Sequence, residues 1–341
     1  MSVELDPSTK ADLVLEGGGV KGLGLVGAVT TLAQHGYRFP RVAGTSAGAI
    51  VGSLIAACTA TGTDLNHLAG VMRSVEYDRF RDRTVLDHFG LPGEALELAI
   101  GRGVYKADYL VSWLGEQLRD IGVVTFEDLR ISEEEDPHSS LPDRQRYRLV
   151  VMTSDISSGQ LVRLPWDAEE HYGVDPDGMK VVDAVRASMS IPFFFQPFTL
   201  TKGDHSKVTL VDGGMLSNFP IECFDRTDGA PSRWPTFGVK LSAQPGAHQQ
   251  PRATGNTFEL AMACLATLLG AHDAYHLDDE RVTQRTIFVD TMGVDATDFD
   301  IDAETQHKLF QNGTLAAESF VESWPPPGFT PEGDWKGGSA G

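Results

Sequence analysis

The sequence has little cysteine, few positive charges relative to negative ones, and no long apolar run. Its three cysteines, Cys58, Cys223 and Cys264, are odd in number and far apart, with no C-x-x-C pair. This pattern argues against a disulfide framework or a cysteine zinc site, and it predicts a reducing, cytoplasmic compartment. The chain has 28 Lys and Arg residues against 48 Asp and Glu residues, a net charge of −20. That charge repels a phosphate backbone, so nucleic acid is not expected as a partner.

The most apolar stretch, Ala47 to Ala60, is too short to span a membrane. It has about 14 residues, whereas a helix needs ~20 to cross a bilayer. The N-terminus carries Glu4, Asp6 and Asp12 before any apolar run, which is the reverse of a signal peptide. The sequence therefore predicts neither a membrane span nor a signal peptide.

Apolar segments alternate with glycine-rich turns over the first sixty residues. A short strand is expected at Leu13–Leu15, a helix at about Gly22–His35, a second strand at Phe39–Ala43 and a helix at Ala47–Thr61. Strands that alternate with helices favour a parallel sheet covered on both faces. The expected fold class is therefore α/β.

The remaining segments extend this pattern. Residues 64–130, with a helix at Lys106–Leu118, are expected to form either an insertion or a layer that covers the sheet. An exposed acidic loop is predicted at Glu133–Pro137. Further expected elements are strands at Arg146–Thr153, Val208–Val211 and Trp234–Leu241, a helix at Val181–Ala187 and an apolar helix at Thr257–Ala271.

The run Gly44-Thr45-Ser46-Ala47-Gly48 is a G-x-S-x-G motif between an expected strand and an expected helix. This setting is typical of a nucleophile elbow, in which a strained turn exposes the serine hydroxyl at the edge of a sheet. Gly44 and Gly48 are required there because side chains would collide with the neighbouring strand and helix. Ser46 is thus the candidate nucleophile.

A second glycine-rich turn, Gly17-Gly18-Gly19-Val20-Lys21-Gly22, lies between the first strand and the first helix. It matches the G-x-G-x-x-G pattern of dinucleotide-binding proteins, and a nucleotide-binding module is one alternative. That interpretation needs an acidic residue at the end of the second strand, where this chain has Ser46 instead. Consecutive glycines at the start of a helix also free backbone amides to bind an oxyanion. We therefore expect an oxyanion hole.

The third motif is Asp212-Gly213-Gly214, which directly follows an expected strand. Taken alone, an Asp followed by two glycines is often only a turn. The competing Asp228-Gly229 lies in a polar segment with no strand before it, so it is predicted to be a turn.

Together the three motifs resemble those of the patatin-like phospholipase family. That family has a G-G-G-x-[RK]-G loop, a G-x-S-x-G elbow and a distant D-G-[GA], and all three occur here in this order. The family's typical Arg is replaced by Lys21. The resemblance covers residues 11–240 and includes Asn218, Pro220 and the S-x-x-x-P block that starts at Ser188. It implies a three-layer α/β/α fold with a mostly parallel central sheet.

The resemblance also implies a chemistry. It makes Ser46 the nucleophile and Asp212 its partner in a dyad without histidine, and it places the oxyanion hole at Gly17, Gly18, Gly19 and Val20. The implied activity is hydrolysis of acyl esters of phospholipids or lysophospholipids without a metal or organic cofactor. An α/β-hydrolase with a Ser-His-Asp triad is the other enzyme class considered, although its nucleophile elbow comes later in the chain.

Two further expectations concern the ends of the domain and its lipid partner. The acyl hydrolase domain is expected over residues 11–323, followed by a Pro- and Gly-rich tail at 324–341. Phe193, Phe194, Phe195 and the 257–271 helix belong either to the core or to an apolar patch that reaches a membrane surface. Because net negative charge opposes binding to anionic lipid, contact through such a patch is expected to be transient.

Overall fold

The fold is built on one central sheet. The computed structural model describes residues 9–80, 105–136, 139, 141–226, 232–241, 263, 267, 279–296 and 298–325. Within these residues the strand order is β5-β6-β3-β2-β1-β7-β8, and β4 pairs with β3. The strands are β1 (Asp12–Leu15), β2 (Val42–Thr45), β3 (Leu149–Asp155), β4 (Gln160–Leu164), β5 (Phe198–Thr201), β6 (Lys207–Asp212), β7 (Thr236–Lys240) and β8 (Thr286–Phe288).

The centre of the sheet is parallel and one side is antiparallel. Strands β3, β2, β1, β7 and β8 run parallel, whereas β4 and β6 are antiparallel to β3, and β5 is antiparallel to β6. Every residue of β1, β2, β3 and β7 is buried. Such burial is expected of parallel strands, both of whose faces are covered. The α/β class with a mostly parallel sheet is thus confirmed.

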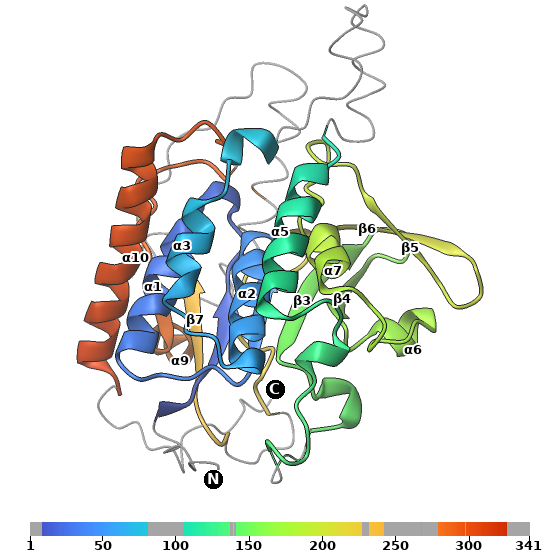
Figure 1. The fold of residues 1–341 in the computed structure, drawn as a ribbon, viewed down its shortest axis with the longest axis horizontal. Coiled ribbons are helices and arrows are strands. Elements are labelled where there is room, and N and C mark those ends of the chain that lie inside the picture. Colours follow the sequence, from blue (N-terminus) through green and yellow to red (C-terminus); the bar gives the residue numbers. More distant parts are fainter. Residues whose placement is uncertain are drawn as a thin grey trace, which may run out of the picture.

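Helices flank this sheet, and five of them pack side by side in the order α10-α1-α2-α5-α7 (Figure 1). The helices are α1 (Gly22–Gln34), α2 (Ala47–Thr61), α3 (His67–Arg73), α5 (Asp108–Ile121), α6 (Ala168–Tyr172), α7 (Val181–Ser188), α9 (Glu280–Gln284) and α10 (Ala303–Ser323). Helix α3 packs on α1, and α5 packs on α2 and α7, so the described parts of residues 64–130 pack mainly on other helices and not directly on the sheet. No helix within the described ranges is long and apolar enough to cross a bilayer.

Two predicted strand boundaries were wrong. The strand expected at Phe39–Ala43 starts at Val42 and runs to Thr45, because Pro40 has no N–H to donate to a strand ladder. The strand expected at Arg146–Thr153 starts at Leu149, because Tyr147 pairs with Arg130 outside the sheet. Both strands therefore extend further toward the carboxyl edge of the sheet.

The acidic loop is largely exposed, as predicted. Glu133, Glu134 and Glu135 are exposed and Asp136 is half-buried, whereas Pro137 lies outside the described residues. Glu135 pairs with Arg148, and Asp136 pairs with Arg233 at 2.6 Å. The loop thus contributes two ion pairs.

The C-terminal third contains elements that the sequence did not reveal. Strand β8 extends the sheet beyond β7, and α10 packs along α1. Trp324, placed at the start of the predicted tail, packs its ring 4.8 Å from Phe237 and 5.3 Å from Phe320. The rest of the predicted tail after Pro325 lies outside the described residues, as does the predicted 257–271 helix except for Ala263 and Thr267.

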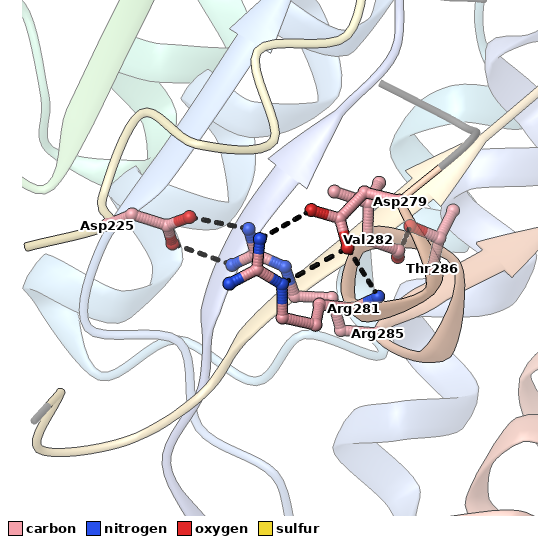
Figure 2. Close-up of polar contacts among 6 residues, drawn as sticks. All are labelled: Asp225, Asp279, Arg281, Val282, Arg285 and Thr286. Atoms are coloured by element: carbon pink, nitrogen blue, oxygen red, sulfur yellow. Dashed lines mark hydrogen bonds and ion pairs between the residues drawn. The ribbon is translucent and has the colours of Figure 1, made fainter. Parts of the chain in front are cut away.

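A buried arginine joins this C-terminal part to the rest of the domain. The Arg285 guanidinium donates two hydrogen bonds of 2.6 Å to the Asp225 carboxylate, beside the exposed Asp279–Arg281 pair (Figure 2). Arg285 has 3% of its side chain exposed and Asp225 has 32%. The pair therefore links the segment after β6 to the start of β8.

We expect Asp225→Ala to lower the free energy of unfolding by about 2–3 kcal/mol, because it removes the carboxylate that accepts two hydrogen bonds from a buried guanidinium. Urea denaturation measures this loss. Arg281→Ala is the matched control: it breaks an exposed pair, for which a change of less than ~0.5 kcal/mol is expected. Equal losses in both variants would contradict the assignment of the Arg285 pair as the stabilising one.

Candidate active site

Ser46 lies in a sharp turn between β2 and α2. Its φ of 53° and ψ of −119° fall in a region that non-glycine residues rarely adopt. The residue is 4% exposed and lies at the carboxyl end of β2. This is the strained strand-turn-helix geometry of a nucleophile elbow.

The glycines that flank Ser46 are required by close contacts. A Cβ on Gly44 would lie 2.3 Å from the Gly48 carbonyl oxygen, and a Cβ on Gly48 would lie 2.2 Å from the Leu15 carbonyl oxygen. Any larger residue would push α2 away from β1 and β2. The two glycines thus allow the turn to be tight enough to hold Ser46 at the sheet edge.

Ser188 holds the backbone of the elbow. The Ser46 N–H donates to the Ser188 Oγ at 2.8 Å, and the Ser188 hydroxyl donates to the Met152 carbonyl at 2.6 Å. Ser188 is fully buried at the end of α7. This chain of hydrogen bonds fastens the strained turn to the central strand β3.

Asp212 reaches the same place along the same edge of β3. Thr45 pairs with Met152, and Asp212 pairs with Thr153, the next residue of β3. Strand β4 pairs with residues 151–155 of β3 on the opposite edge, so β6 continues along β3 where β2 ends. Ser46 and Asp212 are therefore brought together where these two strands meet. The first residue after β6, Gly213, starts a turn in which the Gly214 N–H donates to Asp212 Oδ1 at 2.8 Å.

Burial raises the pKa of the Asp212 carboxyl from 3.8 to about 6, although hydrogen bonds from the Gly214 amide and the Ser46 hydroxyl act in the opposite direction. Asp212 is 4% exposed. A carboxylate with this pKa is still mostly ionised at neutral pH, and it is a better proton acceptor than an ordinary Asp. Asp212 is thus suited to accept the proton of an adjacent hydroxyl.

The glycine loop lies against Ser46. A Cβ on Gly17 would lie 3.2 Å from the Ser46 Cβ, and the Gly17 N–H donates to the Asn218 carbonyl at 3.2 Å. Gly19 has a φ of +57°, and Gly19–Lys21 form a single helical turn that leads into α1 at Gly22. The Lys21 N–H donates to the Gly18 carbonyl within this turn.

The amides of the loop are not equally available to a ligand. The Val20 N–H donates to the Ala296 carbonyl at 3.2 Å, and the Gly17 N–H is bound to Asn218. For the N–H groups of Gly18 and Gly19, there is no acceptor among the described residues. The sequence had placed Val20 and Gly17 with these two glycines in the oxyanion hole, whereas the hydrogen bonds leave the Gly18 and Gly19 amides for that role.

A small apolar cavity lies beside Ala47 and Met189, two neighbours of Ser46. It measures about 20 Å³, and its walls include Gly19, Ala47, Met189 and Phe299. The Ser46 hydroxyl contacts the Met189 sulfur at 3.4 Å. The cavity has room for about one water molecule, so an acyl chain enters only if the surrounding side chains move.

The alternatives raised by the sequence find no support here. Among the described residues, no histidine hydrogen-bonds Ser46 or Asp212, as a Ser-His-Asp triad would require. Asp228, the competing acidic residue, lies outside the described residues. Gly19 packs against the Ala296 carbonyl, which leaves little room there for a nucleotide phosphate.

A larger cavity of about 1200 Å³ lies at the opposite, amino-terminal ends of the parallel strands. Its walls include Asp12 and Arg41, which pair with each other, and Arg148, which pairs with Glu135. In open α/β sheets, ligands bind outside the carboxyl ends of the strands. Position and chemistry therefore both favour the edge that carries Ser46, not this 1200 Å³ cavity, as the reaction site.

The family model described as "Patatin-like phospholipase" matches residues 13–225. The chain belongs to the patatin-like phospholipase family. An uncharacterized protein of Bacillus subtilis (strain 168), YqhO, is 36% identical over 317 residues, which cover 92% of this chain and 98% of that protein. This patatin-like chain is also similar to uncharacterized protein R571 of Acanthamoeba polyphaga mimivirus, with 26% identity over 65% of this chain and 64% of the relative.

Among solved structures, VipD from Legionella pneumophila shares the patatin fold. The TM-score is 0.50 at 18% identity, over 92% of this chain and 67% of VipD. Together with the family match, the shared fold confirms the resemblance and the α/β architecture predicted from the motifs. Membership in this family supports hydrolysis of lipid esters as the general activity.

Several residues at the site escaped the sequence analysis. Ser188 and Asn218 were noted as parts of family motifs, but their contacts with Ser46 and Gly17 were not foreseen. Ala296 and Phe299 lie beyond the motifs, and no sequence pattern connected them with the glycine loop. The buried pair of Glu16 and Lys240 was also missed.

Proposed function

We propose that the protein is a serine acyl hydrolase that cleaves acyl esters of phospholipids or lysophospholipids with a Ser46–Asp212 dyad. The observation that carries this proposal is the strained elbow at Ser46 next to a buried carboxyl whose pKa is raised to about 6. The family match supports a lipid ester as the substrate.

In the first step, the Ser46 Oγ attacks the acyl carbonyl carbon while Asp212 takes the hydroxyl proton. The carbonyl oxygen becomes an oxyanion, which accepts hydrogen bonds from the Gly18 and Gly19 amides. The positive end of α1 lies directly behind this loop and favours the same charge. Collapse of the tetrahedral intermediate breaks the ester bond, and the leaving alkoxide receives the proton from Asp212.

In the second step, water attacks the acyl-Ser46 ester. Asp212 accepts a proton from the water, and the same two amides bind the second oxyanion. The fatty acid leaves when the Ser46 oxygen recovers the proton. Both steps use the same groups, so the mechanism needs no histidine.

Mass spectrometry of products from phosphatidylcholine and lysophosphatidylcholine with distinct acyl chains tests this proposal. Free fatty acid with wild type, and none with Ser46→Ala, is expected. Release from the diacyl lipid identifies a phospholipase A, and release from the monoacyl lipid alone identifies a lysophospholipase. Absence of fatty acid from both lipids and from a soluble acyl ester would refute the proposed function.

Of the three phenylalanines considered either for the core or for a lipid-contacting patch, only one is exposed. Phe194 and Phe195 are 8% and 0% exposed, whereas Phe193 is 42% exposed and has a φ of 67°. Phe193 follows Met189 by four residues, on the loop that borders the nucleophile. It is therefore placed to enter a lipid surface next to the site.

We expect Phe193→Asn to reduce hydrolysis of phosphatidylcholine vesicles about fivefold, because partial burial of this ring in lipid is worth about 1 kcal/mol. Asn tolerates positive φ, so the loop conformation is retained. Hydrolysis of a soluble ester should stay within twofold of wild type. As a control, Leu315→Gln removes an equally apolar residue, 61% exposed on α10, and should leave both rates unchanged.

If Phe193→Asn and Leu315→Gln lower vesicle hydrolysis equally, Phe193 has no specific part in lipid contact. Equal loss on vesicles and on the soluble ester would instead assign Phe193 to the shape of the site.

A further inference from the structure

Glu16 and Lys240 form a buried ion pair next to the glycine loop. Leu15 of β1 pairs with Val239 of β7, and each charged residue comes one position later: Glu16 directly follows β1, and Lys240 is the last residue of β7. Their side chains are 7% and 5% exposed, and the Lys240 ammonium donates to Glu16 Oε1. The pair thus lies at the carboxyl edge of the sheet, where Ser46 and Asp212 also lie.

The Glu16 carboxylate accepts hydrogen bonds from two separate segments, Asn218 and the consecutive residues Lys240 and Leu241. Oε1 accepts from Lys240 and, at 3.4 Å, from the Asn218 side-chain amide; Oε2 accepts from the Leu241 N–H. Each oxygen of a carboxylate can accept more than one hydrogen bond. An apolar side chain of the same size cannot join these segments.

Two of these donor residues, Asn218 and Leu241, also contact the glycine loop. The Asn218 side-chain amide also donates to the Gly17 carbonyl at 3.3 Å. The Leu241 side chain lies against Gly18, because a Cβ on Gly18 would be 2.5 Å from the Leu241 Cδ1. Glu16, the residue directly before the loop, thereby holds Asn218 and Leu241 in place, and these two residues contact Gly17 and Gly18.

A buried ion pair is weak evidence for a gain in stability. Removal of two charges from water costs about as much as their attraction returns, and apolar replacements are often as stable. Retention of charges here is better explained by the geometry that they impose than by stability. An oxyanion hole requires donors within a few tenths of an ångström of their place, so small displacements of the loop lower kcat.

We propose that the Glu16–Lys240 pair is a positioning device that sets the place of the Gly18 and Gly19 amides relative to Ser46. This inference rests on the proposed function, because it assumes that these amides bind the oxyanion. Glu16 and Lys240 act through the loop and do not touch the reacting atoms. The pair should therefore affect kcat more than KM, since the oxyanion exists only in the transition state and intermediates.

The test replaces the pair by apolar residues, Glu16→Leu with Lys240→Met, so that no charge is left unpaired. We expect a melting temperature within a few degrees of wild type, a 10–100-fold lower kcat on a soluble ester, and a KM within threefold. Unchanged kcat in the folded double variant would overturn the proposal. A parallel loss of kcat and of folded protein would make the pair merely structural.

Asn218→Ala provides a second route, for the case that the double variant does not fold. It removes the side-chain amide between Glu16 and Gly17 but leaves the ion pair in place, and a 3–10-fold lower kcat is expected. Full kcat in Asn218→Ala would also count against the proposal. Asp225→Ala is the control: it breaks the Arg285 pair at the opposite, amino-terminal end of the sheet, where Asp225 lines the larger cavity, and its kcat per folded molecule should equal that of wild type.

Wild-type activity separates this inference from the proposed function. If wild type and Ser46→Ala are equally inactive on all acyl esters, the proposed function fails. If wild type is active and the double variant matches it, only the positioning role fails.

Discussion

Ser46→Ala is expected to reduce kcat for ester hydrolysis by at least about 10⁴-fold, because loss of the nucleophile removes the acyl-enzyme route. Alanine has the same Cβ as serine, so the strained turn at φ 53° is retained and the fold should not change. A fluorophosphonate probe should label wild type at Ser46 and leave the variant unlabelled. Intact-protein mass spectrometry and hydrolysis of a soluble ester measure the two effects.

A serine nearby provides the matched control. Ser53 lies on α2, is fully buried and donates to the Ile50 carbonyl at 2.7 Å. Ser53→Ala removes a hydroxyl from the same helix and should leave labelling and kcat within twofold of wild type. Full activity of Ser46→Ala with a label at another serine would contradict the assignment of Ser46.

The parts of the site that the sequence revealed are those set by local backbone geometry. A turn with φ near +50° between a strand and a helix needs glycines on both sides, so the elbow around Ser46 leaves a readable pattern. The same holds for Gly19, whose positive φ and contact with Ala296 leave no room for a side chain. Asp212 was readable because it ends a strand and caps the turn that follows.

The parts that the sequence did not reveal depend on contacts between distant segments. Glu16 and Lys240 are 224 positions apart, and their pairing follows from the alignment of β1 with β7. Ala296 meets Val20 after the chain has passed through β8, a strand of three residues. No local pattern marks such pairs, because the strand order that brings them together is a property of the whole sheet.

The sequence also did not predict which of three neighbouring aromatic side chains are buried. The run Phe193-Phe194-Phe195 has one composition, but its members differ because Phe194 and Phe195 pack with Phe299 at 5.3 Å and 6.5 Å while Phe193 does not. Composition alone left open whether these three rings lie in the core or at a lipid-contacting surface. Phe299, the aromatic partner that buries Phe194 and Phe195, lies about a hundred residues later in the chain.

The second large effect is expected for Asp212→Asn, which should lower kcat about 10³–10⁴-fold, because an amide accepts no proton from Ser46. In wild type, kcat/KM should rise with pH and level off above about 6, where the Asp212 carboxyl loses its proton. This inflection should be absent from the residual activity of the variant. Steady-state kinetics on a soluble ester between pH 4 and pH 8 measure both.

Asp183→Asn is the control for this effect. Burial also raises the pKa of Asp183, which lies on α7. Its replacement should leave kcat and the pH inflection unchanged. A wild-type inflection that persists in Asp212→Asn would assign the titration to another group.

Stability should change in the opposite direction to activity. The pKa of Asp212 is about 6 in the folded protein and near 3.8 in the unfolded chain, so the folded state binds the proton more tightly. The proton on Asp212 therefore stabilises the folded state fully below pH 3.8. This stabilisation of about 3 kcal/mol is lost as the pH rises through 6. Asparagine carries no charge and avoids this cost, so the melting temperature of Asp212→Asn relative to wild type should increase from pH 4 to pH 7.5. A variant that is less active and more stable at neutral pH identifies a carboxylate whose burial serves the reaction, because a residue kept for folding would lose stability when it is replaced.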